Sequence, residues 1–85
     1  MDRVMGWERR VSLAVVLAQG NRSDLARKQL QRCIADLNAA RLRALSTGSL
    51  YRLQVLCKAL DLPITDPALR ELARQLLPAE LRRRV

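Results

Sequence analysis

The residue types that could carry out catalysis in this 85-residue chain are two cysteines and a few carboxylates, because the chain has no histidine. Without histidine, the usual general base at neutral pH is missing. Cys33 and Cys57 lie in apolar stretches with helical spacing, where a cysteine behaves as a small hydrophobe. A thiol nucleophile needs a cation or a base beside it, and the sequence neighbours Arg32 and Lys58 point away on a helix. A disulfide between the two cysteines is compatible with this spacing but is not implied by it.

The carboxylates have structural explanations. They fall on polar helix faces or at helix starts, at Asp24, Asp36, Asp61, Asp66, Glu71 and Glu80. Two thiols without histidine leave a tetrahedral zinc site half empty. Gly48 stands alone, whereas a phosphate cradle needs several glycines before a helix. We therefore expect no enzymatic activity, no metal and no cofactor.

The formal charge of +8 comes from 16 Lys and Arg against 8 Asp and Glu, and such a field attracts acidic partners and nucleic acid. Arginine pairs could contact phosphates. The helix expected near residues 50–60, however, offers only Arg52, Gln54 and Lys58 for reading bases, and aromatic stacking platforms are missing. The arginine bias also has a compositional source in GC-rich coding. Nucleic-acid binding is thus the alternative function rather than the leading one.

The elements that must position these residues are helices. Seventeen leucines recur at helical spacing, and β-branched residues are too scattered for strands. The pattern predicts a single all-α domain with helices at about 4–19, 24–44, 49–61 and 67–77, and a last turn at 79–84. Short connections predict two antiparallel hairpins. Whether the second helix breaks near Asn38 is left open by the sequence.

Capping residues mark the expected ends of these helices. Gly20-Asn21 is suited to a left-handed C-cap, and Ser23 to the N-cap of the second helix. Ser46 or Thr47 can cap the third. Asp66-Pro67 combines an N-cap with a proline at the first helical position.

The apolar run 11–18 loosely resembles a secretory signal, but it is short and follows a segment that carries acidic residues. It is also too short to span a bilayer. We therefore expect a cytoplasmic protein that does not span a membrane.

The turn Gln19-Gly20-Asn21 is followed by Ala26, Leu30 and Cys33, with Ile34 next. Over residues 7–37 this arrangement resembles a tetratricopeptide-type helical hairpin, in which small residues let paired helices approach. One extra residue separates Gly20 from Ala26, and residues 50–77 do not repeat the pattern. The resemblance implies a protein-interaction scaffold, with this chain at the capped end of an array.

The first helix is apolar on more sides than one neighbour can cover. We therefore expect a protein-interaction module that binds a partner helix or an acidic segment, or that self-associates through this helix. The candidate contacts are Trp7, Arg10, Arg27 and Tyr51. Trp7 also has a simpler interpretation as half-buried core.

Overall fold

The computed structural model describes the backbone of residues 3–85 and the side chains of residues 6–85. The apolar position expected at Val4 therefore lies outside the described side chains. The protein is all-α, as predicted, and strands are absent from residues 3–85. The helices are α1 (Arg3–Gln19), α2 (Ser23–Ala35), α3 (Ala39–Ala44), α4 (Thr47–Ala59), α5 (Pro67–Leu76) and α6 (Ala79–Arg82). None of these helices has both the length and the apolar character needed to cross a membrane.

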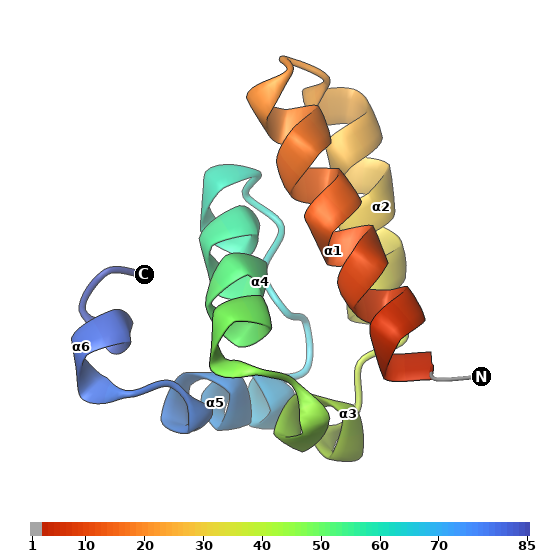
Figure 1. Ribbon diagram of the computed structural model, residues 1–85. Helices are drawn as coiled ribbons and strands as arrows, with labels where there is room; N and C mark the ends of the chain where they lie inside the picture. The colour runs from red at the N-terminus through yellow and green to blue at the C-terminus, as the bar shows by residue number, and fades with distance from the viewer. Residues whose placement is uncertain (1–2) are drawn as a thin grey trace.

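The helices α1 and α2 form an antiparallel hairpin with a tight turn (Figure 1). Asn21 takes the left-handed conformation, with φ of 61°, and the N–H of Arg22 donates to the carbonyl of Leu17 at 2.8 Å. This is the Schellman arrangement that ends many helices. The left-handed residue is Asn21 rather than Gly20. Ser23 is the first residue of α2 and makes no side-chain capping bond, so the predicted cap at Ser23 is not formed.

The long second helix predicted over 24–44 is two helices. Asn38 is extended, and its side-chain oxygen accepts a hydrogen bond from the N–H of Arg41 at 2.8 Å. Asn38 is therefore the N-cap of α3, and a residue that caps a new helix cannot continue the old one.

Both ends of α4 have a local signal. Ser46, rather than Thr47, is the N-cap and accepts from the N–H of Ser49 at 3.2 Å. At the other end, Asp61 takes a left-handed φ of 54°, and the N–H of Leu62 donates to the carbonyl of Cys57 at 2.9 Å. The two helices that line the groove described below, α1 and α4, thus end in the same kind of turn.

The connector after α4 determines where α5 begins. Residues 62–66 run back along α4, so α5 starts near the other end of α4 and crosses below it (Figure 1). Five extended residues reach about 17 Å, which is close to the length of a helix of 13 residues. The second pair of helices is therefore not the antiparallel hairpin that the sequence predicts. Asp66 and Pro67 start α5 as predicted, because the carboxylate accepts from the N–H of Ala68 at 2.9 Å.

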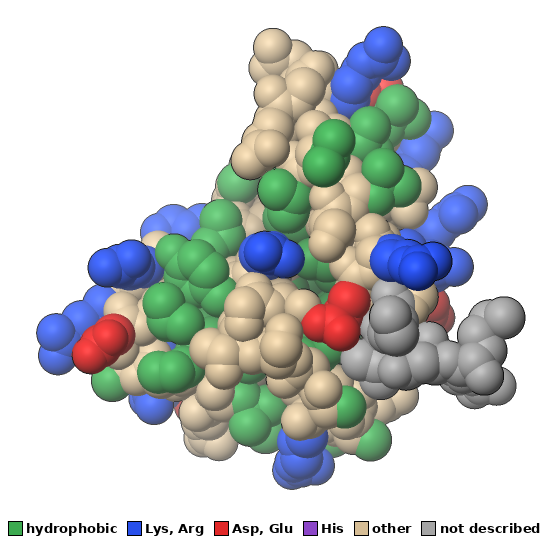
Figure 2. Space-filling view, in the orientation of Figure 1, with side chains coloured by type: hydrophobic (Ala, Val, Ile, Leu, Met, Phe, Trp, Pro, Cys, Tyr) green, Lys and Arg blue, Asp and Glu red, His purple; other side chains and the backbone are tan. Residues whose placement is uncertain are grey.

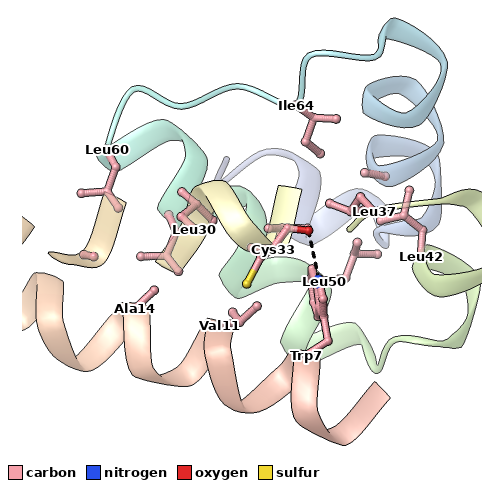
Figure 3. Packing of buried hydrophobic residues seen from close by; sticks show 14 of the residues in the cluster. Trp7, Val11, Ala14, Leu30, Cys33, Leu37, Leu42, Leu50, Leu60 and Ile64 are labelled. Carbon is pink, nitrogen blue, oxygen red and sulfur yellow. Dashed lines mark hydrogen bonds between the residues drawn. The ribbon is translucent and has the colours of Figure 1, made fainter. Parts of the chain in front are cut away.

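The core lies where α1, α2 and α4 meet the connector and α5 (Figure 3). Its largest fully buried side chains are Leu30, Leu42, Leu53, Leu77, Val11 and Cys33. Trp7 is only 3% exposed, and its indole N–H donates to the carbonyl of Cys33 at 3.0 Å. Among the buried side-chain polar atoms of the described residues, none lacks a hydrogen-bond partner. This core fixes the position of α4 relative to the α1–α2 hairpin.

Candidate functional site

Charged side chains of the α1–α2 hairpin hold α4 at both of its ends. Glu8 of α1 accepts hydrogen bonds from the hydroxyls of Ser46 and Ser49 at the N-terminus of α4. Arg27 of α2 donates from Nη1 to the carbonyl of Leu60 at its C-terminus. A carboxylate is favoured at a helix N-terminus and a cation at its C-terminus. The two contacts therefore match the dipole of α4 and set its position beside α1.

A groove lies between α1 and α4, with a volume of about 300 Å³. We call it the α1–α4 groove. Its walls are Val15, Ala18 and Gln19 from α1, and Tyr51, Arg52, Val55, Leu56 and Ala59 from α4. The α1 members lie within one turn, and Tyr51, Val55 and Ala59 follow at intervals of four residues, which places them on one stripe of α4. Two helix stripes thus face each other across an open apolar channel.

The apolar surface continues beyond the groove itself. Val16 of α1 is 62% exposed, and it lies three residues from Gln19 at the groove edge. Leu13, one turn before Val16, is 45% exposed. Figure 2 shows hydrophobic side chains at the surface over both α1 and α4. Single exposed apolar residues are ordinary, but a mainly apolar groove between two helices is a candidate contact surface.

The charge in this groove is small for so basic a chain. Of the lining residues, Arg52 is charged and Gln19 is polar, and the others are apolar apart from the hydroxyl of Tyr51. A ligand that fits this surface is therefore mainly apolar, with an acceptor or an acidic group near Arg52.

The four predicted contact residues do not lie together. Tyr51 is half-buried in the wall of the α1–α4 groove. Trp7 is in the core, where a partner does not reach it. Arg10 pairs with Asp36 at 3.4 Å near the start of α1, while Arg27 binds the carbonyl of Leu60 at the far end of α4. Arg10 and Arg27 thus form contacts between helices of this chain. A sequence alone does not distinguish such arginines from arginines that bind a partner protein.

Several groove residues were not predicted as contacts: Val15, Ala18, Arg52, Val55, Leu56 and Ala59. The available signal was the excess of apolar residues on the first helix. That signal predicts a contact surface on α1 but gives no information about which helix lies opposite.

Both cysteine thiols have raised pKa values. Burial raises the pKa of the Cys33 thiol to about 11, and burial followed by the nearby Cys33 raises the pKa of Cys57 to about 11. Both are free thiols, and at neutral pH they are protonated and weakly reactive. Within the part of the chain that the structure describes, no three Cys, Asp or Glu side chains gather as a metal site would require.

Comparisons with family models, with curated proteins and with solved structures find no match to this chain.

Proposed function

We propose that this protein is a non-enzymatic interaction module whose α1–α4 groove receives an amphipathic helix of a partner protein. The observation that carries the proposal is the mainly apolar groove between one face of α1 and one face of α4. Val16, next to Val15 of the groove wall, is exposed. Helix-in-groove recognition uses apolar anchors at intervals of three and four residues, which fit a channel of this kind. An acidic residue of the partner helix would pair with Arg52.

The resemblance to a tetratricopeptide-type hairpin points the same way. Ala26, Leu30 and Cys33 are fully buried, as small and large residues at that spacing would be between paired helices. On this proposal the α1–α2 hairpin is a terminal unit of a helical scaffold, and it supplies one wall of the groove.

Nucleic-acid binding is the alternative, because the net charge of +8 favours it. The two functions differ in their response to salt. Phosphate contacts weaken steeply as salt rises, whereas burial of apolar surface does not.

The test is a pull-down from native lysate at about 0.05 M and about 0.5 M salt, followed by binding of the purified partner. The variant carries Val55→Glu in the groove wall and Val16→Glu next to Val15 of the groove wall, which place charge on two exposed apolar positions. The control carries Gln31→Glu and Ala35→Glu on exposed positions of α2, with the same change in charge. We expect a partner that is retained at both salt concentrations by the native chain and the control, and lost by the groove variant.

Retention of an oligonucleotide at low salt alone, with no effect of the groove variant, would favour the alternative. Sedimentation of the purified chain distinguishes a second copy as the partner. A dimer that the groove variant abolishes would assign this surface to self-association instead.

A further inference from the structure

A second cavity lies on another side of α4 and has a different character. It has a volume of about 470 Å³, and it is bounded by α4, the connector, α5 and the segment around α6. We call it the α4–α6 pocket. Its α4 wall consists of Gln54, Cys57 and Lys58, a stripe distinct from the Tyr51, Val55 and Ala59 stripe of the α1–α4 groove. Its volume is typical of small-molecule sites.

The floor of the α4–α6 pocket is apolar. Cys57, Pro63, Ile64, Ala73 and Val85 supply carbon and sulfur surface from four different segments. The side-chain amide of Gln54 donates to the carbonyl of Ala73 at 2.8 Å and so connects α4 to α5 across the floor. An apolar body of modest size is the part of a ligand that suits this surface.

The rim of the pocket carries an excess of cations. Lys58, Arg70, Arg74 and Arg82 line it, together with the carboxylates Asp61 and Glu71. Arg74 and Glu71 pair at 2.8 Å. The hydrogen bond from Arg74, with a smaller contribution from the charge of Arg82, holds the pKa of Glu71 below its usual value. With that pair neutralised, three cations remain against Asp61, so the rim attracts an anion.

Two of these cations are held in place by hydrogen bonds from their Nε atoms to backbone carbonyls. The Nε of Arg70 donates to the carbonyl of Ile64 at 3.1 Å, and the Nε of Arg82 donates to the carbonyl of Leu77 at 2.8 Å. The terminal nitrogens of both guanidinium groups make no hydrogen bond to another described residue. A guanidinium that is already oriented loses less entropy when it binds a carboxylate with its two parallel N–H donors.

We propose that the α4–α6 pocket binds a small carboxylic acid with an apolar body, with the carboxylate at the cationic rim and the body on the apolar floor. The lining contains no aromatic side chain on which a nucleobase could stack, so a nucleotide does not suit the pocket. The site is separate from the α1–α4 groove, and the proposal does not depend on the function of that groove.

The test uses octanoate as the probe and follows its binding to the full chain by ¹H–¹⁵N NMR. The side-chain amide of Gln54 and the backbone amide of Ala73 report on the floor of the pocket. The backbone amides of Val15 and Ala18 report on the α1–α4 groove. We expect octanoate to shift the first set and not the second. Octanol should bind about tenfold more weakly than octanoate because it lacks the charge. Acetate should also bind more weakly than octanoate, because it lacks the apolar body.

The two lysines of the chain provide a matched pair of variants, since both are exposed. Lys58→Glu reverses a charge at the pocket rim, and Lys28→Glu makes the same change on α2. We expect the dissociation constant of octanoate to rise about tenfold in the first variant and less than twofold in the second. Equal effects of the two variants, equal binding of octanol and octanoate, or shifts confined to the α1–α4 groove would each overturn the proposal.

Discussion

The α1–α4 groove and the α4–α6 pocket share one helix and differ in what surrounds it. The groove is an open channel with apolar walls and one arginine, whereas the pocket has an apolar floor and a rim of several cations. The difference shows that a strongly basic chain need not be basic on every surface. At the pocket, Arg70 and Arg82 donate to backbone carbonyls, whereas the groove between α1 and α4 is lined mainly by apolar side chains.

The first prediction tests whether the side chains of the groove wall contribute to the stability of the fold. Leu53 is fully buried and Val55, two residues later on α4, is 37% exposed at the groove. Leu53→Ala should lower the free energy of unfolding by about 3 kcal/mol, because it leaves a cavity in the core. Val55→Ala should lower it by less than about 0.5 kcal/mol. Urea denaturation of the two variants gives the measurement. A large loss for Val55→Ala would mean that the groove wall serves stability rather than binding.

The second prediction distinguishes the two sites through Cys57, which lines the pocket and not the groove. Because its pKa is raised to about 11 from 9.0, the thiolate fraction at pH 8 is about a hundredfold lower than in an unfolded chain. In a Cys33→Ala background the smaller contribution of Cys33 is removed and the burial of Cys57 remains, so alkylation should still be much slower in the native protein than in urea.

Octanoate should slow the alkylation of Cys57 further, and a helix bound in the groove should leave it unchanged. The rate should rise about tenfold per pH unit around neutral pH, because burial keeps the thiolate the minor form there. Native alkylation as fast as in urea would contradict the burial of this thiol.

The third prediction compares the start of α5, a wall of the pocket, with the start of α2, the hairpin partner of the groove wall α1. Asp66 caps α5, a wall of the pocket, whereas Ser23 at the start of α2 makes no capping bond. Asp66→Ala should lower the free energy of unfolding by about 1 kcal/mol, and Ser23→Ala by no more than a few tenths. Thermal or urea unfolding decides between them. Equal losses would show that Ser23 forms a cap in solution.

Local signals in the sequence predicted the parts of the fold that depend on neighbouring residues. The caps at Ser46 and Asp66 and the turn at Gly20-Asn21 involve bonds within a few residues, and they were predicted at or within one residue of their positions. The break at Asn38 is equally local. It was left open because an asparagine can also lie on the polar face of a continuous helix.

The orientation of α5 was predicted wrongly because the connector was treated as a short link. Its extended backbone, its left-handed Asp61 and its buried Ile64 carry the chain back along α4. The burial of Ile64 against distant helices is a tertiary effect that no local pattern reports.

The candidate site was predictable only in part, for the same reason. Of the predicted contacts, Tyr51 lies in the wall of the α1–α4 groove, whereas Arg27 binds a carbonyl 33 residues away. The excess apolar surface of α1 was visible in the sequence, and the position of α4 opposite to it was not.

The α1–α2 hairpin closes through contacts between adjacent segments, whereas α4 joins it only after a further helix and a loop have been made. During synthesis on a ribosome, the α1–α2 hairpin therefore emerges before α4. Until α4 is in place, Val15 and Ala18 of α1, which lie opposite α4 in the finished protein, have no helix on that side. During that interval the hairpin exposes apolar surface. We therefore expect the nascent chain to be a substrate for chaperones that bind short apolar segments.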